Sequence, residues 1–404
     1  MDKGPLQNKG FPEAANRNAG RAALRFVLLL GLVSLFADMT YEGSRSITGP
    51  FLSLLGASAT AVGIVAGAGE FIGYGFRLLS GYVADRTGRY WTFTLLGYGL
   101  NLLAVPLPAL AGRWEVAAAL LMAERFGKAI RTPARDAMLS HVTAEMGRGW
   151  GFGIHEAMDQ IGAVMGPLIV AAVLYARGDY RGGFGILLIP ALLALATLAA
   201  ARVLYPSPHE LEAAPHAPRE AGGKQLSRTF WLYLAFVATS VAGYAHFQLI
   251  SYHFRAQAVV PEAQIPVFFA VAMGVDALVA LVIGRLFDRI GLVTLTVVPV
   301  LTMPIAFLVF SRGYGLALAG VVLWGAVMGI QETIMRAAIA GMVPASRRGT
   351  AYGIFNTAYG LSWFLGSAAM GLLYDVSAIH IIAFSVALQL ISIPVLIAVQ
   401  RVAS

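Results

Sequence analysis

The sequence contains no cysteine and little charge. Asp, Glu, Lys and Arg make up 12% of the 404 residues, whereas soluble domains carry about 25%. The absence of cysteine excludes disulfide bonds and thiolate metal sites. No G-x-x-x-x-G-K-[ST] segment is present either, which argues against a nucleotide-driven protein. We therefore expect no cofactor and no enzyme activity.

Long apolar runs dominate what is present. Hydrophobic residues make up 58% of the chain, and the mean hydropathy is +0.72. A helix needs about 20 apolar residues to cross a bilayer. Breaks at charged residues, Pro and Gly delimit twelve runs of suitable length, which predict a polytopic all-α membrane protein. The predicted spans are 23–53, 58–80, 91–111, 114–136, 150–175, 183–202, 229–252, 265–286, 292–311, 314–338, 350–373 and 379–400.

The distribution of positive charge predicts the orientation. Residues 1–20 are polar and lack the apolar core and small residues of a cleavable signal, so the first span is expected to remain in the membrane. Most Lys and Arg residues fall in tails and loops that are cytoplasmic if the N-terminus is inside. The exceptions are Arg113, Arg177, Arg181, Arg255 and Arg312 outside, and Arg45 and Arg125 within the membrane. This bias predicts a plasma (inner) membrane protein with both termini cytoplasmic, and it accounts for the net charge of +8 without nucleic acid.

The chain divides into two similar halves. A polar stretch at 204–227 is expected to be a cytoplasmic linker between six-helix bundles at 1–203 and 228–404. "GYVADRTG" (81–88) returns as "GRLFDRIG" (284–291), and "RGWGFGI" (148–154) returns as "RGTAYGI" (348–354). In both motifs the second copy follows the first at almost the same distance along the chain. This regular distance indicates duplication of a six-helix unit.

These residues carry a resemblance. "GYVADRTGRY" resembles the loop motif between helices two and three of the major facilitator superfamily, and "GRLFDRIG" occupies its second-half position. Twelve spans, the linker and the repeat extend the resemblance over nearly the whole chain. It implies two pseudo-symmetric bundles around a cavity that opens alternately to either side. The loop residues are then expected to gate this motion by contacts with helix ends. They are Gly81, Asp85, Arg86, Gly88, Arg89, Gly284, Asp288 and Arg289. The alternative is that the arginines only mark topology.

"QIGAVMGP" (160–167) resembles the antiporter motif of drug/proton exchangers. Gly162, Gly166 and Pro167 match its core, but Leu168 to Ala171 stand where the motif has further glycines. Small residues in a membrane helix also let a neighbouring helix approach closely. Helix packing is therefore an equal explanation for this motif.

Four ionisable residues share one depth. Asp38, Glu70, Arg125 and Asp159 belong to four different spans, and each lies roughly 15–22 Å from the cytoplasmic charge layer at about 1.5 Å per residue. Charges at membrane depth are costly and normally face a cavity or one another. Under the resemblance, Arg125 matches an arginine that the family uses in proton coupling, although Ala129 replaces the glycine expected after it.

Two of these spans carry polar stripes. Asp38, Glu42 and Arg45 fall within an arc of about 60° on one helix, and His155 and Asp159 face one way at i, i+4. A buried carboxylate beside a cation can exchange a proton near neutral pH, and histidine titrates there unaided. We predict proton coupling by Asp38, Glu42, Glu70, Arg125, His155 and Asp159. The alternative is that such groups only form buried salt bridges.

The second half has fewer charges at depth and offers mainly polar and aromatic groups. We predict substrate contacts from both halves, although Glu332 lies close enough to Arg336 to act as a gate instead. The predicted substrate residues are Tyr41, Arg45, Glu124, Glu156, Tyr244, His246, Gln248, Asp276, Gln331 and Glu332.

These features predict a proton-coupled secondary transporter of a small organic molecule, acting as an exporter by antiport and as a monomer in the bilayer. A divalent-metal transporter is an alternative, in which His155, Asp159 and Asp38 bind the ion. An organic-anion transporter and a membrane scaffold or receptor are further alternatives. The mixed charges leave cationic, zwitterionic and anionic substrates open.

Overall fold

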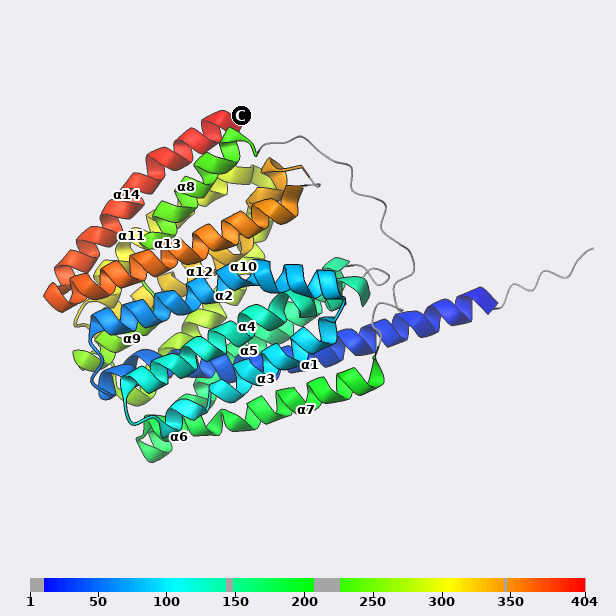
Figure 1. Ribbon diagram of the computed structural model, residues 1–404. Helices are drawn as coiled ribbons and strands as arrows, with labels where there is room; N and C mark the ends of the chain where they lie inside the picture. Colours follow the sequence, from blue (N-terminus) through cyan, green and yellow to red (C-terminus); the bar gives the residue numbers. More distant parts are fainter. Residues whose placement is uncertain (1–10, 143–147, 207–225, 345–346, 404) are drawn as a thin grey trace, which may run out of the picture.

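The computed structural model describes residues 11–142, 148–206, 226–344 and 347–403. Within these ranges every regular element is a helix (Figure 1). Most of the predicted linker 204–227, and half of the polar segment 1–20, lies outside the described residues.

The first half forms one bundle of helices. Its elements are α1 (Phe11–Leu54), α2 (Ala59–Thr87), α3 (Tyr90–Ala104), η1 (Leu107–Leu110), α4 (Trp114–Val142), α5 (Arg148–Arg177), α6 (Tyr180–Ile186) and α7 (Leu188–Leu204). The second half repeats the arrangement. Its elements are α8 (Arg228–Ala242), α9 (Phe247–Ala256), η3 (Glu262–Gln264), α10 (Ile265–Ile290), η4 (Gly291–Thr296), α11 (Val297–Val309), α12 (Tyr314–Met342), α13 (Arg348–Val376) and α14 (Ala378–Ala403).

The described helices account for the twelve predicted spans. Nine helical stretches meet a simple test of length and hydropathy, and one of them, Glu262–Val309, has 48 residues. That length is about 70 Å of helix, which is two crossings, and α10 ends within it at Gly291. The two remaining spans, α4 and α13, do not meet this test. Helix α4 carries many charges, and α13 has a lower hydropathy because it is rich in Gly, Ser and Tyr. The fold is therefore two pseudo-symmetric six-helix bundles.

Spans six and seven, which we predicted as continuous, each consist of two α-helices. Span six consists of α6 and α7, and span seven consists of α8 and α9 with a break from Gly243 to His246. Neighbouring side chains satisfy the backbone groups that this break frees. Ser385 Oγ donates to the Gly243 carbonyl at 2.7 Å, and Trp324 Nε1 donates to the Ala245 carbonyl at 2.8 Å. A break within a membrane is tolerated for this reason.

The sequence repeats coincide with helix boundaries. Gly88 ends α2 at a φ of 65°, and Gly291 ends α10 at a φ of 59°, a backbone region that glycine adopts without strain. The second repeat begins α5 at Arg148 and α13 at Arg348. Each motif therefore starts or stops an equivalent helix in the two halves.

Glycines bring helices into close contact at equivalent places. A Cβ atom on Gly162 or Gly166 would collide with the carbonyl oxygens of Leu35 and Met39 on α1. In the second half, Gly366 on α13 lies in the same way against Ala242 on α8. Such contacts bring two backbones together, as in other small-residue helix interfaces.

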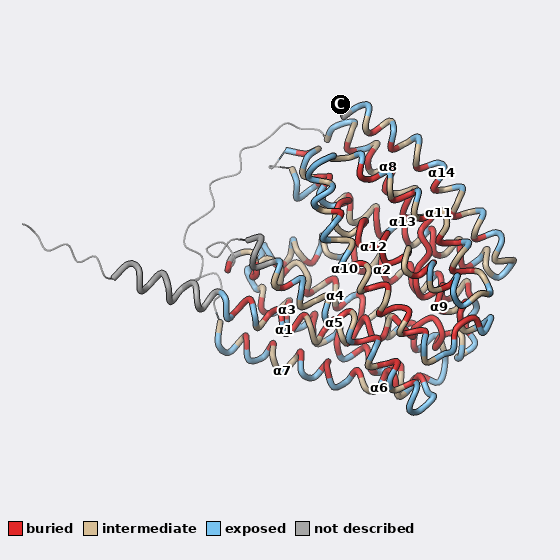
Figure 2. The backbone as a smooth tube through the Cα atoms, turned by 180° about the vertical axis from the view of Figure 1, so that it is seen from behind, coloured by how far each residue is buried: buried red, intermediate tan, exposed pale blue. Residues whose placement is uncertain are grey.

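Large apolar side chains face outward and several charged ones are buried. Figure 2 shows where the buried and exposed parts of the backbone lie. Leu96, Leu278 and Leu372 are 64%, 67% and 57% exposed, whereas Asp38 and Glu70 are 6% and 5% exposed. An exposed apolar surface around buried charges suits a protein whose exterior contacts lipid. The chain is an integral membrane protein, and charges in the middle of its helices, such as Asp38 and Glu70, face inward.

The two halves meet differently at the two ends of the bundle. We call the end that holds the C-terminus and Thr87 the terminal face, and the end that holds Leu54 and Ala59 the far face (Figure 1). At the far face Asp375 on α13 accepts hydrogen bonds from the amides of Ala59 and Thr60 at 3.2 and 3.0 Å, and from the Thr60 hydroxyl at 2.5 Å. Close backbone contacts of Gly63 and Gly371 extend this seam. The far face is therefore closed.

Candidate functional site

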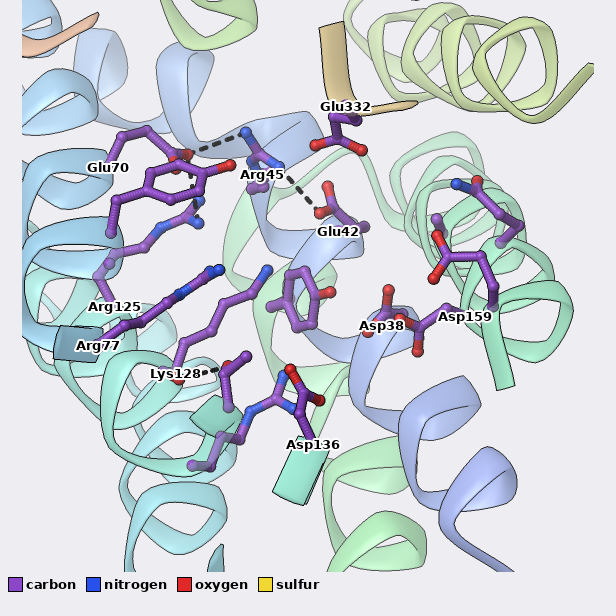
Figure 3. Close-up of a pocket in the computed structure, with 18 of the residues that line it drawn as sticks. Asp38, Glu42, Arg45, Glu70, Arg77, Arg125, Lys128, Asp136, Asp159 and Glu332 are labelled. Carbon is purple, nitrogen blue, oxygen red and sulfur yellow. Dashed lines mark hydrogen bonds and ion pairs between the residues drawn. The ribbon is translucent and has the colours of Figure 1, made fainter. Parts of the chain in front are cut away.

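A cavity of about 350 Å³ lies between the halves. Helices α1, α2, α4 and α5 of the first half and α10, α12 and α13 of the second contribute to it. Charged side chains dominate its lining (Figure 3). The carboxylates are Asp38, Glu42, Glu70, Asp136, Glu156, Asp159, Asp276 and Glu332, and the cations are Arg45, Arg77, Arg125, Lys128, Arg131, Arg135 and Arg336.

A second cavity of similar volume continues the first toward the terminal face. It shares Tyr74, Arg77 and Arg336 with the first cavity and adds residues at the start of α13. Leu78 and Arg336, which line it, are exposed. The central cavity therefore opens to the terminal face while the far face is closed.

One set of charges is paired. Arg45 donates to Glu42 at 2.9 Å and to Glu70 at 3.1 Å, and Arg125 contacts the same Glu70 oxygen at 3.3 Å. Arg125 Nε lies 3.1 Å from Glu124, which also accepts a hydrogen bond from Asn101 at 2.8 Å. All these side chains are at most 12% exposed. They form a continuous buried network between α1, α2, α3 and α4.

Asp38 and Asp159 lie together on the opposite side of the cavity from Arg77 and Arg125 (Figure 3). Neither carboxylate has a cation within 4 Å among the described residues. Position 38 reaches this place because α1 packs closely along α5 at Gly162 and Gly166. The four residues predicted to share one depth, Asp38, Glu70, Arg125 and Asp159, all line this one cavity.

His155 lines the cavity and belongs to a short chain of hydrogen bonds. Its Nε2 lies 2.8 Å from Ser34 Oγ, and Ser34 also accepts from Arg135 at 3.1 Å. Ser34 therefore links Arg135 to His155 at the wall of the cavity.

Several predicted substrate residues lie outside the central cavity. Tyr244 is buried, stacks on Trp324 and donates to the Trp324 carbonyl at 2.7 Å. His246 stacks on Trp363 with ring centroids 4.1 Å apart. Gln331 accepts a hydrogen bond from Tyr359 at 3.1 Å. Glu124 and Gln248 line only a small neighbouring void. In the described structure these five side chains do not line the central cavity.

The cavity brings together cations that the sequence assigned to cytoplasmic helix ends. Arg77, Lys128, Arg131 and Arg336 all line it. On α4 the sequence does indicate which residues share the face that lines the cavity. These residues recur at i, i+3, i+7 and i+10, and they are Arg125, Lys128, Thr132 and Arg135. The depth of the cavity, which lets these side chains point inward, is a property of the tertiary structure.

The predicted gating residues are exposed at the terminal face. Asp85 accepts a hydrogen bond from Tyr90 at 3.1 Å, and Arg86 donates to Tyr82 at 2.9 Å, both within the first half. In the described part of the chain, no hydrogen bond or ion pair joins Asp85, Arg86 or Arg89 to the second half. Asp288 and Arg289 are also exposed. This face is the open one.

The alternative prediction is a divalent-metal site formed by His155, Asp159 and Asp38. Among the described residues, no group of three or more His, Asp or Glu side chains is placed to hold a metal ion. His155 Nε2, one of the predicted ligands, is instead engaged by Ser34.

Comparison with known proteins identifies the family. Residues 30–367 match the Major Facilitator Superfamily model. An uncharacterised protein of Mycobacterium tuberculosis is 42% identical over 386 residues, covering 94% of each chain. An uncharacterised MFS-type transporter of Methanocaldococcus jannaschii is 27% identical over 376 residues, covering 90% of this chain and 92% of the relative.

Solved structures share the fold. A bacterial homologue of the human lysosomal transporter Spinster, in an inward-facing and unoccupied conformation, superposes with a TM-score of 0.72 at 14% identity, covering 94% of this chain and 97% of that one. A peptide transporter, POT, in complex with sulfate gives a TM-score of 0.73 at 14% identity, covering 94% of both chains. The family match over most of the sequence, together with the fold and the central cavity, shows that this chain belongs to the major facilitator superfamily and is a membrane transporter.

Proposed function

We propose that this transporter couples the movement of a small organic molecule to the proton gradient by antiport, and that it acts as an exporter. The observation that carries the proposal is the placement of Asp38 and Asp159. Both carboxylates line the central cavity without an ion pair in the described structure. A carboxylate in such a site can bind and release a proton as the cavity changes its access.

The arrangement of helices supports alternating access. Residues 1–203 and 228–404 move as two bundles around the cavity, and the positive-inside bias assigns the terminal face to the cytoplasm. The present conformation then faces the cytoplasm. The exposed residues Asp85 and Asp288 engage the opposite half when that side closes, which explains why neither contacts that half through a hydrogen bond or ion pair among the described residues.

Glu70 and Arg125 take a supporting part in this scheme. Both are fully committed to the buried network with Arg45, so they hold the α1, α2 and α4 helices in register rather than exchange the proton. The paired network thereby restricts proton coupling to the α1 and α5 side of the cavity.

Flux in proteoliposomes tests the proposal. Vesicles containing a pH-sensitive dye would be screened with candidate compounds, with and without an imposed pH gradient. We expect gradient-dependent proton movement with the wild-type protein. Asp38→Asn and Asp159→Asn should each abolish the coupled movement, because an amide cannot carry the proton, while an exposed control, Glu115→Gln, retains it. Unchanged coupling in both aspartate variants would refute the assignment, and an absence of gradient-dependent movement with any compound would refute proton coupling.

A further inference from the structure

The cavity also contains charged side chains that form no ion pair in the described structure, and their arrangement follows a pattern. Within the described residues, ion pairs involve Glu42, Glu70 and Asp136 among the cavity carboxylates and Arg45, Arg125 and Arg135 among its cations. In the described ranges, the rest of the cavity charges have no oppositely charged partner within 4 Å. Their positions decide what kind of molecule the cavity can hold.

The unpaired carboxylates lie close enough to repel one another: Asp38 repels Asp159, and Glu156, Asp276 and Glu332 repel one another. They are Asp38 on α1, Glu156 and Asp159 on α5, Asp276 on α10, and Glu332 on α12. Helices α5 and α10 pack against each other across the boundary between the halves. Asp38 and Asp276 are 6% and 3% exposed, and Oδ1 of Asp159 has no hydrogen-bond donor. This acidic wall therefore contains contributions from both halves.

Most of the unpaired cations lie on other helices. Arg77 lies on α2, and Lys128 and Arg131 lie on α4. Lys128 Nζ is 3.8 Å from the centroid of the Tyr41 ring. Arg131 is 1% exposed, its guanidinium is 4.2 Å from the centroid of the Tyr98 ring, and its Nε and Nη1 have no acceptor. Aromatic rings offer these cations only a weak substitute for a carboxylate.

Figure 3 shows two members of each group on opposite sides of the cavity. Arg77 and Lys128 extend into the cavity from α2 and α4, and Asp38 and Asp159 face it from α1 and α5. Among these unpaired cations, Arg336 is the exception to the separation of cations from carboxylates. It lies on α12, one turn from the carboxylate Glu332. Unpaired charges are expensive at membrane depth. A purely cationic ligand would leave the basic wall unpaired, and a purely anionic ligand would leave the acidic wall unpaired.

We propose that the transported molecule is a small zwitterion of the amino-acid or dipeptide class, whose ammonium group binds the acidic wall and whose carboxylate binds Lys128 and Arg131. The cavity of about 350 Å³ lies at the small end of ligand pockets, which range from about 300 to 1,000 Å³. This inference rests on the proposed function. In addition, the ammonium group of the substrate and the proton bind Asp38 and Asp159 alternately, as antiport of the two requires.

Equilibrium binding without any gradient tests the ligand class. Purified protein at about pH 6.5, below the pKa of about 7.7–8.0 of a peptide α-amino group, would be titrated with four forms of one skeleton. These are leucine (zwitterion), leucinamide (cation), N-acetylleucine (anion) and N-acetylleucinamide (neutral), followed by the corresponding forms of alanylalanine. A bond to a charged group contributes enough to change affinity by about 10- to 100-fold. We expect the zwitterion of at least one skeleton to bind tighter than each singly charged form by this factor.

Variants of each wall assign the two ends of the ligand. Lys128→Gln or Arg131→Gln should reduce zwitterion affinity to that of leucinamide and leave leucinamide binding unchanged. Asp159→Asn or Asp276→Asn should reduce the affinity for the zwitterion to the affinity for N-acetylleucine. Arg113→Gln is the matched control, because Arg113 lies outside the cavity with a side chain 76% exposed. Two variants per wall keep the test decisive if one of them fails to fold.

The outcomes separate this inference from the proposed function. Equal or tighter binding of a singly charged form, or no binding by any form of either skeleton, would overturn the zwitterion assignment while leaving proton-driven flux of another compound intact. Preferred binding of a zwitterion without gradient-dependent flux would support the ligand class and contradict proton coupling.

Discussion

At the scale of single residues, the most constrained charge is Glu70. One of its oxygens lies 3.1 Å from Arg45 and 3.3 Å from Arg125, and the carboxylate is 5% exposed. Two buried cations therefore share one counter-ion. Buried pairs add little net stability, but removing one partner leaves a charge without compensation.

Replacing Glu70 with Gln should destabilise the folded protein. We expect the free energy of unfolding to fall by about 3 kcal/mol, at the lower end for a broken buried pair, because Glu42 and Glu124 still face the two arginines. Thermal or denaturant unfolding in detergent measures the change. Glu115→Gln removes the exposed pair with Arg113 and should change stability by less than about 1 kcal/mol. Equal effects of both substitutions would contradict a central role for Glu70.

The residue scale also shows how far the sequence can be interpreted. The stripe of Asp38, Glu42 and Arg45 followed from helical spacing alone, and the structure places all three in the cavity. Which of them pairs with Glu70, and which remains unpaired, depends on the neighbouring helix. The same spacing on α4 could have identified Lys128, but its closeness to cytoplasmic arginines gave it the appearance of a topology marker.

At the scale of helices, glycine positions determine which elements touch. Gly166 lies against the Met39 carbonyl, where an added Cβ would collide with backbone. This contact holds α5 on α1 and thereby places Asp159 near Asp38. The motif that resembles an antiporter signature thus has a direct packing explanation.

A larger residue at Gly166 should separate the two helices. Gly166→Leu forces backbone movement and should cost about 1–3 kcal/mol, the usual range for overpacking, and it should also reduce coupled flux. Gly99→Ala on α3 is the control, because nothing lies within 4 Å of its added Cβ and alanine favours helix. Unfolding measurements on both variants check the prediction. A Gly166→Leu protein as stable as wild type would show that the contact is not required.

The division of spans six and seven into two helices each could not be predicted from hydropathy, because apolar runs continue through both spans. Trp324 on α12 supports the break in span seven, because its carbonyl accepts from Tyr244 and its Nε1 donates to the Ala245 carbonyl. Such support is visible only once α12 is placed beside α8 and α9.

At the scale of the whole molecule, Asp375 links the two halves at the far face. It caps the first turn of α2 through Ala59 and Thr60, although the two segments lie more than 300 residues apart in sequence. This contact must break for the cavity to open on that side. It is therefore a candidate latch for the present conformation.

Removing this latch should shift the conformational equilibrium. Asp375→Ala loses hydrogen bonds at a partly exposed site, so opening of the far face should increase about 2- to 10-fold. Because the chain has no cysteine, a single Ser367→Cys substitution in the seam, where Ser367 is 1% exposed, reports opening through its maleimide labelling rate.

A similar cap within one half provides the comparison for this experiment. Asp179 accepts a hydrogen bond from the Gly182 amide at the start of α6, and Asp179→Ala should leave the labelling of the Ser367→Cys protein unchanged. An unchanged labelling rate in Asp375→Ala would show that the seam is held by backbone packing alone.

The sequence by itself determined that the protein is an integral membrane protein with twelve spans in two similar halves, and which main charges fall in the middle of its helices. These properties depend on local hydropathy, repeat spacing and helical rise, which are readable along one chain. Only the tertiary structure decided which charges pair, because a carboxylate such as Glu70 is neutralised by cations on helices distant in sequence. The division of the cavity into an acidic and a basic wall follows from that pairing, since it is made of the charges that helix packing leaves without partners.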